Sequence, residues 1–143
     1  MAGKGYASLK LDKAQAKEII KVMKMAGMEC LPASDLHCTI MYDESNPDIK
    51  LLKNTKVYKA KVKSVGLLGN AIVLHLDSPS IQQRHKELKN AGYKHSYPSL
   101  KVHMSINYSP KPGDEDLLKL LVQLKGIPSV LKFGDEKFSP LED

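Results

Sequence analysis

The sequence predicts a single α+β domain, and three observations support this prediction. The chain has 143 residues, which is the size of one ordinary domain. Some stretches alternate apolar and polar residues with the period of a strand, whereas others repeat apolar residues with the period of a helix. The turns between these stretches suit strands that pair largely antiparallel.

The N-terminal part predicts a strand, a helix and a second strand. Residues 6–11 alternate like a strand, and Asp12 is the expected N-cap of a helix over residues 13–26. Gly27 ends that helix, and residues 36–42 form the next strand. The apolar face of the helix comprises Ile19, Val22, Met23 and Ala26.

The central part predicts a hairpin followed by a second helix. Residues 55–68 read as a long strand that turns at Gly69 into a strand over residues 71–76. Ser78 is the expected N-cap of a helix over residues 79–91, with a proline in its first turn.

The C-terminal part predicts a strand, a helix and a last strand. Residues 102–108 form the strand, and Asp114 opens a helix with acidic residues at its positive end. Residues 130–138 form the last strand, with an interruption expected at Gly134. The buried stripe of the helix is expected at Leu117, Leu120, Leu121 and Leu124.

A strand-helix-strand unit occurs twice, with corresponding positions about 66 residues apart. His103 follows His37 by 66 residues, and Gly92 ends the second helix as Gly27 ends the first. Repetition of one unit predicts two lobes related by a pseudo-two-fold axis. The lobes are expected roughly over residues 1–54 together with the C-terminal strand, and over residues 55–128.

Composition narrows the classes of protein to consider. Hydrophobic residues make up 42% and charged residues 27%, as in a globular protein, and no apolar run is long enough to span a membrane. The start of the chain lacks the pattern of a signal peptide, so a cytoplasmic location and reduced thiols are expected. The net charge of +6 favours an anionic partner such as a nucleotide, although a basic surface that only aids solubility is an equal alternative.

Two His-x-Thr/Ser motifs occupy equivalent strands of the repeat. His37 and Thr39 lie two residues apart, as do His103 and Ser105, so each pair shares one face of its strand. Strict alternation adds Met41 and Asn107 to these two faces and assigns residues of the opposite faces to the core. The core-facing sets are Leu36, Cys38, Ile40 and Tyr42, and Val102, Met104, Ile106 and Tyr108.

The two motifs suit acid-base cleavage of a phosphodiester without a metal or cofactor. One imidazole can take a proton from the attacking oxygen while the other protonates the leaving oxygen, because histidine titrates near neutral pH. The hydroxyls of Thr39 and Ser105 can hold the phosphate oxygens. The alternative is that both histidines are structural, as we expect for His75 between two leucines. His95 and Tyr97 lie in an aromatic and basic loop that could bind a nucleotide or be an ordinary surface loop.

The segments Leu36-His37-Cys38-Thr39-Ile40 and Val102-His103-Met104-Ser105-Ile106 resemble the motifs of the 2H phosphoesterase superfamily. The resemblance covers nearly the whole chain and implies a bilobal fold, with helices outside and a central cleft. Within the superfamily, the opening strand and the first motif look most like the phage anti-CBASS nucleases. Those enzymes degrade cyclic di- and trinucleotides, such as cyclic GMP-AMP, that serve as bacterial immune signals.

The same resemblance implies catalysis by His37 and His103 and a cyclic oligonucleotide as the partner, with no membrane and no stable protein partner. It also matches Tyr6 and Glu136 to a tyrosine and a late glutamate of the anti-CBASS enzymes. Two other functions remain open. One is a related phosphodiesterase acting on RNA 2′,3′-cyclic phosphates or 2′–5′ oligonucleotides, and the other is a nucleotide-binding module without turnover.

Overall fold

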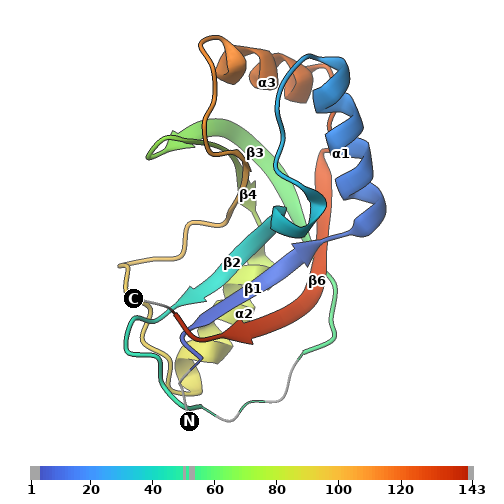
Figure 1. Ribbon diagram of the computed structural model, residues 1–143. Coiled ribbons are helices and arrows are strands. Elements are labelled where there is room, and N and C mark those ends of the chain that lie inside the picture. Colours follow the sequence, from blue (N-terminus) through green and yellow to red (C-terminus); the bar gives the residue numbers. More distant parts are fainter. Residues whose placement is uncertain (1–3, 50, 52–53, 142–143) are drawn as a thin grey trace.

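The computed structural model describes residues 4–49, 51 and 54–141. Its strands and helices confirm the α+β prediction, and Figure 1 shows their arrangement. In chain order they are β1 (Tyr6–Leu11), α1 (Lys13–Met25), the 3-10 turn η1 (Ala33–Asp35), β2 (His37–Tyr42), β3 (Tyr58–Leu68), β4 (Ala71–Asp77), α2 (Pro79–Asn90), β5 (His103–Asn107), α3 (Asp114–Gln123) and β6 (Val130–Ser139).

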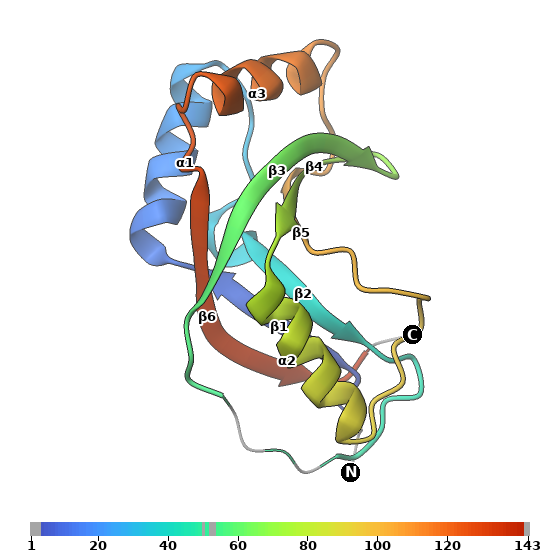
Figure 2. The same cartoon turned by 180° about the vertical axis from the view of Figure 1, so that it is seen from behind.

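The six strands form one closed antiparallel barrel in the order β1-β2-β5-β4-β3-β6, and β6 pairs back onto β1. Helices α1 and α3 lie at one end of the molecule, and α2 lies at the other (Figures 1 and 2). The predicted order of elements in the repeat is confirmed, because β1-α1-β2 is followed by β4-α2-β5. The division into two lobes with a central cleft stays a prediction.

Both copies of the repeat begin their helix in the predicted way. The Asp12 carboxylate accepts a hydrogen bond from the backbone N–H of Gln15 at 3.2 Å. The Ser78 hydroxyl accepts one from the N–H of Ile81 at 3.3 Å. Each cap satisfies an N–H that has no partner within the helix, so both helices start directly after their strands.

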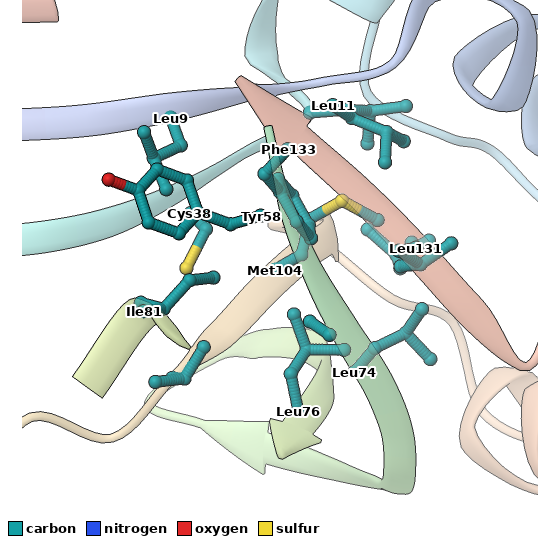
Figure 3. Close-up of a cluster of buried hydrophobic side chains, with 14 of the residues drawn as sticks. Leu9, Leu11, Cys38, Tyr58, Leu74, Leu76, Ile81, Met104, Leu131 and Phe133 are labelled. Carbon is teal, nitrogen blue, oxygen red and sulfur yellow. The ribbon is translucent and has the colours of Figure 1, made fainter. Parts of the chain in front are cut away.

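The inward side chains of the strands and the apolar faces of α1 and α2 form one buried cluster. Figure 3 shows Cys38 and Met104 in this cluster with Leu9 and Leu74 from the flanking strands. Both cysteines are free thiols, and burial raises the pKa of Cys38 to about 12. The middle residue of each His-x-Thr/Ser motif is therefore a core residue, as alternation predicted.

The apolar stripe of α3 differs from the prediction. Leu118 is fully buried, whereas Leu120 and Leu124 are 47% and 69% exposed. The helix packs against β3, and Leu117 and Leu121 are only partly buried beside Leu118. The helix is therefore rotated toward Leu118 relative to the face predicted from periodicity, because its contact with the sheet covers only a narrow strip.

The last strand is continuous but irregular where the sequence predicted an interruption. Its pairing with β1 shifts register between Ser8 and Lys10, opposite Lys137 and Gly134. Asp135 adopts a left-handed backbone conformation with φ of 53° at this point.

No helix within the described residues has the length and hydropathy needed to cross a bilayer.

Candidate active site

The two histidine motifs lie on neighbouring strands. β2 and β5 are antiparallel, and Cys38 and Met104 are Cα partners. Because the two strands run in opposite directions, the residue before Cys38 lies opposite the residue after Met104. His37 therefore lies opposite Ser105, and Thr39 lies opposite His103. All four side chains are partly exposed, while Cys38 and Met104 are fully buried. The motifs thus share one face of the sheet, and each histidine is beside the hydroxyl of the other motif.

A bulge in each strand corrects the predicted faces beyond the motifs. The pairing of β1 with β2 skips Ile40, and the pairing of β4 with β5 skips Ile106. An extra residue reverses the alternation that follows it. Met41 and Asn107 are consequently buried, contrary to the prediction.

The same two bulges move a tyrosine to the histidine face in each copy. Tyr42 lines the cavity beside Thr39 and His103, and Tyr108 is 52% exposed. Strict alternation had assigned both to the core. The signal that could have found them is the identical spacing, because a tyrosine follows each motif histidine by five residues.

Tyr6 contacts both polar residues of the first motif. Its hydroxyl lies 2.9 Å from Nε2 of His37 and 2.9 Å from Oγ1 of Thr39. Burial is the main reason that its pKa is raised, so the hydroxyl remains protonated near neutral pH and can donate to either atom. The structure therefore places Tyr6 beside the first motif, and its contact with substrate stays a prediction.

His103 is oriented by its own backbone segment. Its Nδ1 lies 2.7 Å from the carbonyl oxygen of Lys101, so the Nδ1–H donates this hydrogen bond. The other ring nitrogen, Nε2, is then the one available to exchange a proton. A carbonyl that fixes one nitrogen in this way sets the ring for proton transfer at the other.

A cavity of about 770 Å³ opens on one side of the Cys38–Met104 pair. Thr39 and His103 belong to its lining, whereas His37 and Ser105 lie on the other side of that pair and do not. The remaining lining residues are Tyr42, Leu68, Gly69, His95, Tyr97, Pro98, Ser99, Leu100 and Lys101. This volume is within the range of small-molecule binding sites.

The aromatic loop before β5 forms one wall of the cavity. The ring of Tyr97 is 57% exposed and packs at 5.6 Å from Tyr42 and 5.7 Å from His95, measured between centroids. Nδ1 of His95 accepts a hydrogen bond from the backbone N–H of Tyr42 at 3.2 Å. His95 and Tyr97 are thus held against β2, and Tyr97 leaves an open aromatic face.

Glu136 is not part of the cavity lining, and its contact with substrate stays a prediction. Its side chain is fully buried, and its two oxygens accept hydrogen bonds at 2.8 Å from Nε and Nη2 of Arg84. The backbone N–H of Asn54 also donates to it. A carboxylate with these partners ties β6 to α2. Among the described residues, no group of three or more His, Cys, Asp or Glu side chains is placed to hold a metal ion.

The fold and the site define an α+β barrel that presents two His-x-Thr/Ser strands side by side at a cavity. The chain belongs to the family of the anti-CBASS protein Acb1, whose family model matches residues 4–143.

Relatives of the same description come from phages and bacteria. The protein of Vibrio phage KVP40 is 27% identical over 143 residues, covering 96% of this chain and 87% of the relative. That of Escherichia phage RB16 is 26% identical over 135 residues, covering 89% and 76%. A protein of Sphingomonas paeninsulae is 31% identical over 139 residues, covering 88% of this chain but only 21% of the relative.

Proposed function

We propose that this protein cleaves the 3′–5′ phosphodiester bonds of cyclic di- or trinucleotides by two-histidine acid-base catalysis. It would thereby remove the signal on which CBASS defence depends and allow a phage to evade it. The observation that carries the proposal is the antiparallel pairing of β2 and β5 at Cys38 and Met104. Membership of the anti-CBASS family supports it independently.

The proposed reaction uses a hydroxyl of the substrate as the nucleophile. A ribose 2′-OH attacks the phosphorus of the adjacent 3′–5′ linkage, and the bond from phosphorus to O5′ breaks. One histidine, His37 or His103, takes the proton of the 2′-OH, and the other gives a proton to O5′. The ring opens with a 2′,3′-cyclic phosphate at one end and a 5′-hydroxyl at the other.

The neighbouring hydroxyls support the phosphate in this scheme. Thr39 and Ser105 donate to its non-bridging oxygens, each from beside the histidine of the other motif. Tyr6 holds Nε2 of His37 and the hydroxyl of Thr39 in one hydrogen-bonded chain before substrate enters. This arrangement reduces the reorganisation needed when negative charge develops on the phosphate.

The aromatic wall supports the choice of a nucleotide substrate. Tyr97 offers an exposed ring next to Tyr42, and bases stack on such rings without strong sequence preference. In this proposal Tyr97 and His95 contact a base, while the phosphate lies toward His103.

A panel of substrates tests the proposal. The protein is incubated in EDTA with cyclic dinucleotides, cyclic trinucleotides, 2′,3′-cyclic mononucleotides and 2′–5′ oligoadenylates, and products are identified by mass spectrometry. We expect linear products from the cyclic oligonucleotides, and none from a 2′-deoxy analogue at the cleaved position. The variants His37→Ala and His103→Ala should each be slower by about 10²–10⁴.

Three outcomes would contradict the proposal. Cleavage of only 2′,3′-cyclic phosphates or 2′–5′ linkages would assign a different substrate to the same site. Binding of cyclic nucleotides without any product would indicate a binding module. Full activity in both histidine variants would exclude the two-histidine mechanism.

A further inference from the structure

The row of polar side chains on the histidine face continues beyond His103. His75 of β4 is the Cα partner of His103, and Ser64 of β3 is the Cα partner of His75. Directly paired residues of antiparallel strands point to the same face. Thr39, His103, His75 and Ser64 therefore form one row across four neighbouring strands. At the usual strand spacing of about 4.8 Å, Ser64 lies roughly 10 Å from His103.

A second hollow of about 320 Å³ lies at the far end of this row. It adjoins the main cavity, because Leu100 and Lys101 line both. The other lining residues are Lys63, Ser64, His75, Leu76, Asp77, Gln82 and Val102. His75, which the sequence suggested was structural, is thus partly exposed in a hollow next to the catalytic face.

The hollow carries more positive than negative charge. Two lysines, Lys63 and Lys101, line it against the single carboxylate of Asp77. Burial lowers the pKa of His75, and the nearby charges of His103, Lys101 and Lys63 lower it further. Lys63 and Lys101 therefore lie close enough to act on the His75 ring, and an anion in the hollow would offset their positive charge.

A β-bulge and a glycine position Lys63 and His75 in the second hollow. The pairing of β3 with β4 passes from Val62 to Ser64, so Lys63 is the extra residue of a bulge. The ring of His75 lies against Gly66, where an added Cβ would stand 2.6 Å from Nε2. A side chain at Gly66 would therefore push the imidazole out of its position over β3.

We propose that Lys63, His75 and Lys101 bind a second phosphate of the same substrate whose first phosphate lies at His103. This inference rests on the proposed function and narrows its substrate class. A cyclic dinucleotide carries two phosphates on opposite sides of one ring, so it can occupy both hollows at once. A 2′,3′-cyclic mononucleotide has one phosphate and cannot. The subsite thus selects substrates with two phosphates over 2′,3′-cyclic mononucleotides.

Steady-state kinetics on charge-neutral variants test the subsite. We would measure kcat and KM for 3′,3′-cyclic GMP-AMP in EDTA with Lys63→Gln and His75→Gln. Each should raise KM about tenfold, as expected for the loss of one hydrogen bond to a charged group, and leave kcat nearly unchanged. Lys63→Arg keeps the positive charge and should have a KM near that of the wild-type protein. Lys86→Gln, an exposed substitution on α2, is the matched control and should change neither constant.

A binding measurement separates this inference from the proposed function. Titration calorimetry of the same probe uses His37→Ala as the parent, in which turnover is suppressed, alone and combined with Lys63→Gln or with His75→Gln. If the wild-type protein cleaves the probe but neither Lys63→Gln nor His75→Gln alters KM or Kd, the subsite is wrong and the proposed function stands. If neither the wild-type protein nor any variant cleaves the probe, yet both substitutions weaken its binding, the subsite is supported and the proposed cleavage reaction is not. A fall in kcat with unchanged KM would also overturn it.

Discussion

Cys38 and Met104 are partners across β2 and β5, so each motif places its hydroxyl opposite the histidine of the other motif. The two His-x-Thr/Ser motifs therefore lie side by side on one face of the barrel. A substitution in one motif should consequently affect the chemistry assigned to the other histidine.

Ser105 should tolerate threonine but not alanine. The change Ser105→Thr keeps the hydroxyl and makes the second motif match His37-x-Thr39, and position 105 is only partly buried. We expect kcat/KM on a cyclic dinucleotide to stay near that of the parent. Ser105→Ala removes a donor to the developing charge and should lower kcat by about 10². A parent-like rate for Ser105→Ala would show that this hydroxyl does not contact the phosphate.

Tyr6→Phe should slow the reaction without unfolding the protein. The substitution removes only the hydroxyl that lies 2.9 Å from both His37 and Thr39. We expect kcat to fall about tenfold, as for a hydrogen bond to a group that becomes charged, with a urea midpoint near that of the parent. Tyr93→Phe is the control, because the Tyr93 hydroxyl donates to the carbonyl oxygen of Lys4, outside the motifs. Equal rate losses in both variants would refute a specific role for Tyr6.

Glu136→Gln should destabilise the fold and leave KM unchanged. The substitution removes the buried anionic partner of Arg84 and leaves its guanidinium with the more exposed carboxylate of Glu87 at 3.1 Å. Breaking a buried ion pair typically costs about 3 kcal/mol or more. Urea denaturation should show this loss, and KM is measured at a temperature where the variant is fully folded. A raised KM with unaltered stability would instead support contact between Glu136 and substrate.

Stability should fall as the pH drops below about 6.5. The rings of His85 and His95 meet edge to face at 4.7 Å between centroids. Burial lowers the pKa of both below the ordinary 6.5, and it does the same for His75. In the window below pH 6.5 the unfolded chain binds more protons than the folded one, so protonation favours unfolding there.

Urea midpoints between about pH 7.5 and pH 5 check this pH dependence. The midpoint should be constant above pH 6.5 and decline below it, through the lowered pKa values of the folded state. His95→Gln should reduce the slope, because it removes one proton-binding group and the repulsion between the two rings. A wild-type midpoint that does not change over this range would contradict the expectation.

Local signals in the sequence predicted most of the fold correctly. Asp12 and Ser78 cap the helices as expected, because a side-chain cap depends on residues only three positions apart. The start of β3 was predicted three residues too early, since its first pairing is with β6, a partner far along the chain. The face of α3 was also wrong, because the position of β3 decides which leucines are covered.

The sequence predicted the centre of the site better than its surroundings. The shared faces of His37 with Thr39 and of His103 with Ser105 follow from alternation and agree with the structure. Tyr42 and His75 were assigned to the core or to structural roles. A bulge and a cross-strand pairing decide their positions, and both arise from hydrogen bonds between strands that no local pattern records.

Closure of the barrel has a mechanical consequence for the two histidine strands. β2 and β5 pair directly at Cys38 and Met104. They are also connected through the other strands of the barrel, which are β1, β6, β3 and β4. In a closed barrel every strand is hydrogen-bonded to both neighbours, so β2 and β5 cannot separate unless other strand pairs move as well. The spacing between the imidazoles is therefore preset by the whole circumference. We therefore expect ligand binding to involve side-chain and loop movements, without a hinge motion between the two copies of the repeat.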